Sequence, residues 1–123
     1  MKYISTRSSS ERLSFESVFI KSLADDGGLF LPETDYKFDE KDFLKMQNMS
    51  YYELATEIIH KFTGDFIQKD HLHKLVKKSY SSFRSEDVVK LRQVGKFNIL
   101  ELFHGPTLAF KDIAMQLIGN FYE

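Results

Sequence analysis

Apolar positions in the first eighty residues repeat with the spacing of short helices, after a brief strand predicted at residues 2–6. Ser14 is a suitable N-terminal cap for the first helix, which we expect to end at Asp26-Gly27-Gly28. An extended piece closed by Pro32 follows, and residues 38–46 have the pattern of another short helix. The apolar face of the first helix comprises Phe15, Val18, Phe19 and Leu23.

The clearest helix start lies in the run "MSYYELATEIIHKFTG". Ser50 and Glu53 have the spacing of a capping box, in which each side chain bonds the backbone N–H of the other residue. Gly64 supplies the C-terminal stop, and a further helix is predicted around residues 68–81. The two apolar faces comprise Leu54, Ala55, Ile58, Ile59 and Phe62 in the first helix, and Leu72, Leu75, Val76 and Tyr80 in the second.

The pattern changes near residue 87. The run "VVKLRQVGKFNILELF" reads as two strands joined by Gly95-Lys96, and glycine at the first position of a two-residue loop is typical of a type II′ hairpin. A last helix is predicted from about Thr107 to the end of the chain. Its apolar positions are Ile113, Ala114, Leu117, Ile118 and Phe121.

These patterns divide the chain into two predicted domains. Residues 1–86 form a small, mainly helical unit, whereas residues 87–123 have the strand, turn, strand, loop and helix order that opens an α/β domain. The predicted fold class is therefore α/β, with an α+β arrangement in these 123 residues.

Composition and charge exclude several classes of function. A hydrophobic fraction of 42% and an aromatic fraction of 15% indicate a packed core rather than a disordered chain. The net charge of -1 gives no footprint for nucleic acid or an anionic membrane, and the absence of cysteine excludes thiolate catalysis. No metal site is predicted, because His71 and His73 do not face one another on a helix. With no apolar signal or membrane run, a cytoplasmic protein is expected.

One lysine, Lys111 in "FHGPTLAFKD", follows residue types that restrict the backbone. Gly105 allows unusual backbone angles, and Pro106 fixes its own angle and biases its predecessor away from helix. With Thr107 as the cap, Lys111 is expected in or near the first turn of a helix, whose positive end disfavours a protonated amine. The apolar neighbours Leu108, Ala109 and Phe110 are expected to desolvate it. A partly neutral amine is what a lysine nucleophile requires, although an ordinary surface lysine explains the position equally well.

The run "ELFHGPTLAFKD" closely resembles the lysine motif of threonine synthases, which are pyridoxal-phosphate enzymes of the tryptophan-synthase-β-like fold. The resemblance continues in "AMQLIGNFYE" and returns near the N-terminus in "MKYISTR" and "SFESVFIKSLADDGGLFLPE". Residues 35–86 are similar only in general character. The resemblance implies an N-terminal threonine-synthase-like domain followed by the truncated start of the pyridoxal-phosphate-dependent catalytic domain.

The resemblance implies an activity and one site residue. Family members are carbon–oxygen lyases acting on phosphates, which convert O-phospho-L-homoserine and water to L-threonine and phosphate in threonine biosynthesis. Lys111 matches the catalytic lysine that holds the cofactor covalently and then moves protons at the substrate carbons. Asp112 is expected to have only a supporting role. His104 is interpreted as a hydrogen-bonded residue that shapes the loop, with acid–base work as the alternative. Arg7 is interpreted as a surface or structural residue, with binding of a substrate carboxylate or phosphate as the alternative.

Most of the cofactor pocket is not expected in this chain. A cofactor phosphate needs several backbone N–H donors from a glycine-rich loop or helix N-terminus, and no glycines cluster after Lys111. We therefore expect the chain to be inactive alone, to lack the cofactor, and to self-associate through apolar faces that lack a covering. Two alternatives stay open: a threonine-synthase-like phospholyase, and a short non-catalytic binding or assembly module.

Overall fold

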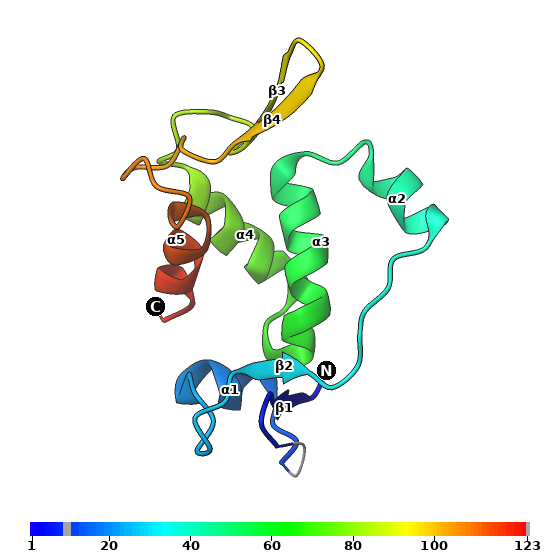
Figure 1. The fold of residues 1–123 in the computed structure, drawn as a ribbon, viewed down its shortest axis with the longest axis vertical. Helices are drawn as coiled ribbons and strands as arrows, with labels where there is room; N and C mark the ends of the chain where they lie inside the picture. Colours follow the sequence, from blue (N-terminus) through cyan, green and yellow to red (C-terminus); the bar gives the residue numbers. More distant parts are fainter. Residues whose placement is uncertain (9–10, 123) are drawn as a thin grey trace. The chain divides into compact units, whose positions relative to one another are not determined.

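The computed structural model describes residues 1–8 and 11–122, which form two compact units (Figure 1). One unit consists of Met1–Asn48 and Thr56–Lys69, and the other of Met49–Ala55 and Asp70–Glu123. The described residues contain five α-helices and two small antiparallel sheets, so the predicted mixed α/β class is confirmed. The predicted domain boundary at residue 86 stays a prediction.

The first unit is built on a short antiparallel pair, β1 (Tyr3–Ser5) with β2 (Phe30–Pro32). Helix α1 (Phe15–Lys21) lies between them in the sequence, and the Ser14 hydroxyl accepts the Ser17 N–H at 3.2 Å, as the predicted cap requires.

The predicted end of α1 at the glycine pair is wrong, because the helix stops at Lys21. Ser22 takes a positive φ of 64°, and the Leu23 N–H then bonds the Lys21 carbonyl at 2.8 Å in a tight three-residue turn. Leu23 consequently lies outside the helix and is 54% exposed instead of facing the core.

The next two helices both begin with capping boxes. In α2 (Glu40–Met46), Asp39 and Asp42 each accept the other's backbone N–H. In α3 (Tyr51–Thr63), the Glu53 N–H donates to the Ser50 hydroxyl while Glu53 accepts from the Ser50 N–H at 2.8 Å. Both helices and the Ser50 box were predicted. Gly64, with φ +57°, ends α3 and begins the 3₁₀ turn η1 (Gly64–Phe66), as expected.

Replacing Ser50 by alanine is expected to lower the free energy of unfolding of the chain by about 1 kcal/mol, the usual effect of losing such a cap. The Glu53 carboxylate accepts hydrogen bonds from the Ser50 N–H and from the Ser50 hydroxyl, and these bonds lower the pKa of Glu53, with the backbone bond as the larger cause. A lowered carboxyl pKa gives stability that is present near neutral pH and is lost as the pH falls through the folded-state value. Urea unfolding at neutral and acid pH measures both effects. Ser82→Ala in an exposed turn is the control, and equal losses in the two variants would contradict the cap.

The core of the first unit lies between the sheet and the second half of α3. The Tyr3 hydroxyl donates to the Phe62 carbonyl at 2.8 Å, and the Phe15 ring packs 5.4 Å from the Phe66 ring. Val18 and Ile67 are buried with them. Burial of these side chains is the main stabilising contribution in this small unit.

The second unit is centred on α4 (Lys69–Tyr80), whose predicted apolar face is confirmed at its most buried positions. Leu72 and Val76 are fully buried, and Tyr80 is 3% exposed. Helix α5 (Asp112–Phe121) packs beside α4 (Figure 1), with the Tyr80 hydroxyl donating to the Ile113 carbonyl at 2.9 Å. The Asn120 amide adds a second bond, to the Ser79 hydroxyl at 2.9 Å.

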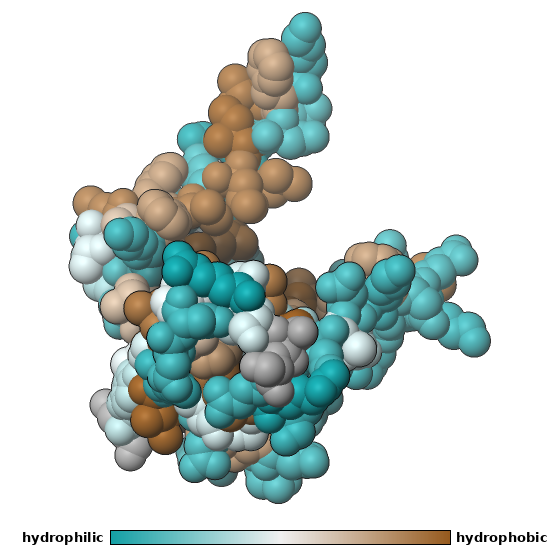
Figure 2. Space-filling model, turned by 60° about the horizontal axis from the view of Figure 1, so that its bottom comes forward, coloured by the Kyte–Doolittle hydropathy of each residue, from teal (hydrophilic) through white to brown (hydrophobic). Residues whose placement is uncertain are grey.

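The predicted hairpin is confirmed as β3 (Lys90–Val94) and β4 (Phe97–Glu101), joined by Gly95 and Lys96. Gly95 has φ +59° and Lys96 is not among the residues with positive φ, which is the pattern of a type II′ turn. Apolar side chains of the hairpin stay exposed and gather along it in Figure 2. Within the described residues, no helix is long and apolar enough to cross a membrane.

Candidate functional site

Lys111 stands at the end of the loop between β4 and α5, one position before the first helical residue. The predicted helix start at Thr107 is wrong by five residues, because Leu108 takes a positive φ of 62° that a helix does not allow. Residues 105–112 instead form consecutive turns, in which the Leu108 N–H bonds the Gly105 carbonyl and the Asp112 N–H bonds the Ala109 carbonyl.

The expected desolvation of Lys111 by its apolar neighbours is not found. Lys111 is exposed, and Phe110 and Leu108 are 64% and 52% exposed. The aromatic and aliphatic side chains that flank the lysine therefore leave its amine in contact with solvent in these 123 residues. Its assignment as the cofactor lysine stays a prediction.

Asp112, the first residue of α5, is buried against this loop, with 3% of its surface exposed. Its Oδ2 accepts the Thr107 backbone N–H and its Oδ1 accepts the Thr107 hydroxyl, both at 2.8 Å. Burial acts to raise the pKa of Asp112, but the hydrogen bonds from Thr107 and from the Ala109 N–H outweigh it and lower the pKa. The ionised carboxylate therefore stabilises the loop at neutral pH, and this contribution is lost as the pH falls through the lowered pKa.

Gly105 is required by the position of this carboxylate. A Cβ at residue 105 would come within 2.4 Å of both Cβ and Oδ2 of Asp112. The sequence indicated a glycine chosen for its backbone freedom, whereas the structure shows one chosen for close approach. Proximity of this kind between residues seven apart leaves no periodic signal in the sequence.

Residues 105–112 are also attached on either side, to the turn after α4 and to the last residue of α4. The Arg84 N–H donates to the His104 carbonyl at 2.8 Å just before this segment, and the Tyr80 hydroxyl donates to the Ile113 carbonyl just after it. His104 Nε2 lies 2.9 Å from Glu101 Oε2, as expected of a histidine that shapes the loop.

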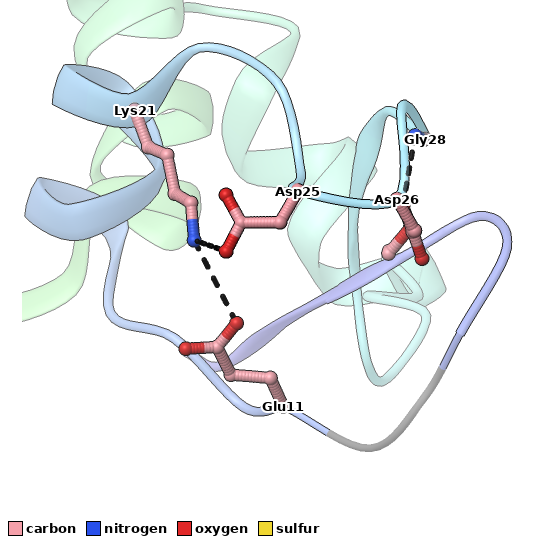
Figure 3. Close-up of polar contacts among 6 residues, drawn as sticks. Glu11, Lys21, Asp25, Asp26 and Gly28 are labelled. Carbon is pink, nitrogen blue, oxygen red and sulfur yellow. Dashed lines mark hydrogen bonds and ion pairs between the residues drawn. The ribbon is translucent and has the colours of Figure 1, made fainter.

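Arg7 and the glycine pair belong to a separate loop in the first unit. The Arg7 guanidinium donates to the Asp26 carbonyl at 3.0 Å, which is the structural role expected of it. Gly28 is not the predicted helix stop but a point of close approach, because a Cβ there would lie 2.1 Å from Ser5 Oγ. Figure 3 shows the Asp26 carboxylate accepting the Gly28 N–H.

Lys21, the last residue of α1, forms ion pairs with two carboxylates near the same loop. Figure 3 shows the Lys21 amine between Asp25, at 2.9 Å, and Glu11, at 3.8 Å. The pKa of Lys21 is raised, first by its hydrogen bond to Asp25. These exposed charges are paired with one another, and in the described part of the chain no group of three or more His, Cys, Asp or Glu could hold a metal ion.

Comparison with known proteins identifies the class to which this fold and loop belong. The family model described as "Threonine synthase N terminus" matches residues 2–80. The threonine synthase of Eremothecium gossypii is 48% identical over 98% of this chain and 25% of its own length, and threonine synthase-like 2 of Pongo abelii is 38% identical over 100% and 26%. A crystal structure of pyridoxal-phosphate-bound threonine synthase from Brucella melitensis superposes with a TM-score of 0.93, at 40% identity over 98% of this chain and 26% of that one.

These findings place the chain in a family whose N-terminal region has this mixed α/β fold. It belongs to the threonine synthase family, and the family match lies in the N-terminal region. The chain spans about a quarter of the length of the curated relatives that it matches.

The residues of this chain fit the cofactor in one respect. Lys111 supplies an exposed primary amine on a loop that is fixed by buried hydrogen bonds. The phosphate of the cofactor needs a cradle of backbone N–H groups, and the one glycine after Lys111 is Gly119, inside α5. Among the described residues a primary amine of the kind that attaches this cofactor is thus present, and no glycine-rich cradle follows it.

Proposed function

We propose that this chain is the N-terminal portion of a threonine synthase and that Lys111 is its cofactor-binding lysine. The similarity to a pyridoxal-phosphate-bound threonine synthase over 98% of the chain carries the proposal. The cofactor, when bound, supplies an electron sink for chemistry at the substrate carbons, and the protein supplies binding and orientation. The substrate of the full-length protein is O-phospho-L-homoserine, which it converts with water to L-threonine and phosphate.

In this proposal Lys111 has two tasks, both performed by its Nζ atom. The amine first attaches the cofactor, and after substrate has displaced it, the same amine accepts and returns protons beside the substrate carbons. Both tasks require a neutral amine for part of the cycle. Because Lys111 is exposed here, the full-length protein has to supply the surroundings that exclude water.

The isolated 123-residue chain is therefore expected to form no threonine from O-phospho-L-homoserine. The measurement is threonine released by the purified chain with added pyridoxal phosphate, compared with the full-length protein under the same conditions. Turnover by the chain alone would overturn the proposal that the full-length protein has to supply the rest of the site. Absence of turnover in the full-length protein would overturn the proposed reaction. The cytoplasmic location stays a prediction.

A threonine-synthase-like phospholyase is the second candidate, because relatives named threonine synthase-like 2 align over the whole chain. Both candidates release phosphate from a phosphorylated amino acid, so the organic product discriminates between them. Threonine as the sole product supports the first candidate, and a product without the added hydroxyl supports the second. The non-catalytic module would be supported by a gene that stops after codon 123.

We also propose that the isolated chain self-associates through the hairpin. Leu91, Phe97 and Ile99 are 70%, 64% and 47% exposed, and the outer edges of a two-stranded sheet offer unpaired backbone groups. The β3 edge carries Lys90 and Arg92, so pairing two β3 strands would bring like charges together. We therefore assign the contact to antiparallel pairing of two β4 strands about Ile99.

Light scattering at increasing protein concentration tests this pairing. The chain is expected to approach the mass of a dimer, and Ile99→Lys is expected to return it to a monomer, because two lysines would face one another across the pairing axis. Gln93→Lys, on the other strand, is the matched control and should still dimerise. A monomeric mass for the unchanged chain at high concentration would contradict the proposal.

A further inference from the structure

The N-terminal position of α5 is occupied by an unusual residue. Helix caps are normally Ser, Thr, Asp or Asn, whose side chains accept a backbone N–H of the first turn. Here the position before the helix is Lys111, which makes no side-chain capping bond. The acceptor side chain stands one residue later, at Asp112, and it accepts hydrogen bonds from Thr107 in the loop rather than from the first turn of the helix. The cap position is thereby left to a side chain that extends into solvent.

Both oxygens of Asp112 are used to close the loop. One accepts the Thr107 N–H and the other the Thr107 hydroxyl. These two bonds close the backbone segment from Thr107 to Asp112, and Lys111 lies inside that segment. An ordinary acidic residue in a first helical turn faces solvent and interacts with the helix dipole. Burial of Asp112 to 3% exposure and its contact with Gly105 show a different arrangement, in which the carboxylate is part of the loop's interior.

The enclosed backbone is strained, and hydrogen bonds within the loop and on either side of it restrain it. Leu108 holds φ +62°, a conformation that L-residues with side chains seldom adopt and that surrounding contacts have to maintain. Those contacts are the Thr107–Asp112 bonds within the loop, the Arg84 bond to His104 before it and the Tyr80 bond to Ile113 after it. A backbone restrained at three points fixes the direction of the Cα–Cβ bond of Lys111.

From this geometry we infer that Thr107 and Asp112 form a clasp that positions Lys111 for attachment of the cofactor. The inference rests on the proposed function, because it assigns a purpose to the loop only if Lys111 carries pyridoxal phosphate. Thr107 and Asp112 act through the backbone of the loop and are positioning residues. Neither is assigned contact with the cofactor or substrate.

The test uses the full-length protein, titrated with pyridoxal phosphate, reduced with borohydride and mapped by mass spectrometry. Thr107→Val keeps the shape of the side chain and removes its donor, and Asp112→Asn removes one of the two acceptors. Each is expected to weaken cofactor binding by about tenfold or more and to spread the label to other lysines, the scale expected when a supporting hydrogen bond that orients a functional group is lost. Thr107→Ser keeps the hydroxyl and is expected to restore selective labelling of Lys111.

A control separates positioning from general stability. Ser79→Ala removes the bond from Asn120 between α4 and α5 and lowers stability without touching the loop. It is expected to lower the melting temperature as Thr107→Val does, while labelling of Lys111 stays selective. A second measurement needs no variant: the Thr107 amide of the unchanged protein should be protected from hydrogen exchange, and exchange at the rate of an unstructured amide would overturn the clasp.

The outcomes distinguish the inference from the proposed function. Selective labelling of Lys111 that survives both Thr107→Val and Asp112→Asn overturns the clasp and leaves the function standing. Failure to label Lys111 in the unchanged full-length protein overturns the proposed function and the positioning role together. Equal loss of labelling in Thr107→Val and Ser79→Ala also overturns the clasp, because stability alone would then explain the result.

Discussion

Replacing Lys111 by alanine is expected to lower threonine formation by the full-length protein about a thousandfold or more, the scale at which enzymes lose activity when their nucleophile is removed. Alanine cannot attach the cofactor, and it cannot accept or return a proton. The loop itself should be preserved, because the Lys111 side chain makes no capping bond and is exposed. The measurement is the steady-state rate of threonine release at saturating pyridoxal phosphate.

The matched control is an exposed lysine elsewhere in the same unit. Lys74 lies on the exposed side of α4, and Lys74→Ala is expected to keep full activity. An unchanged melting temperature for both variants would show that the loss is chemical and not a failure to fold. Activity of Lys111→Ala within a few-fold of the unchanged protein would contradict the assignment of Lys111 as the catalytic lysine.

Gly105→Ala is expected to have the largest effect on stability, lowering the free energy of unfolding of the chain by about 2–4 kcal/mol. A Cβ at 2.4 Å from two atoms of Asp112 cannot be accommodated without moving the carboxylate. Overpacking costs about 1–3 kcal/mol, and a buried carboxylate that loses its hydrogen bonds adds a comparable amount. Urea unfolding of the 123-residue chain, followed by circular dichroism, measures the change.

A second glycine in the same segment provides a control of opposite sign. A Cβ on Gly119, inside α5, would meet no atom within 4 Å. Gly119→Ala is therefore expected to raise the free energy of unfolding by about 0.5–1 kcal/mol, because alanine is the better helix former. Similar effects of the two substitutions would show that the close approach of Gly105 to Asp112 does not exist in solution.

Features set by neighbouring residues were predictable from the sequence. The Ser14 cap, the Ser50–Glu53 box and the Gly95-Lys96 turn each depend on side chains within a few positions of one another. The buried face of α4 follows from helical periodicity in the same way, since Leu72 and Val76 are one turn apart. In each case the local chemistry and the tertiary structure favour the same conformation.

Features set by contacts across a loop were not predictable. The apolar pattern that suggested a helix from Thr107 continues through Leu108, but the bonds from Thr107 to Asp112 and the positive φ of Leu108 override it. The early end of α1 at Ser22 was also not predictable, because a single residue with positive φ ends the helix although the apolar periodicity continues to Leu23. The exposure of Lys111 could not be read from its apolar neighbours, since their side chains also face solvent.

The most direct test of the central claim is to identify the lysine that holds the cofactor. The full-length protein would be saturated with pyridoxal phosphate, reduced with borohydride, digested and mapped by mass spectrometry. The proposal predicts saturable labelling of one peptide, containing Lys111, which is absent from the Lys111→Ala variant. Labelling of a different lysine, or weak labelling spread over many of them, would contradict the assignment of Lys111 and with it the proposed site.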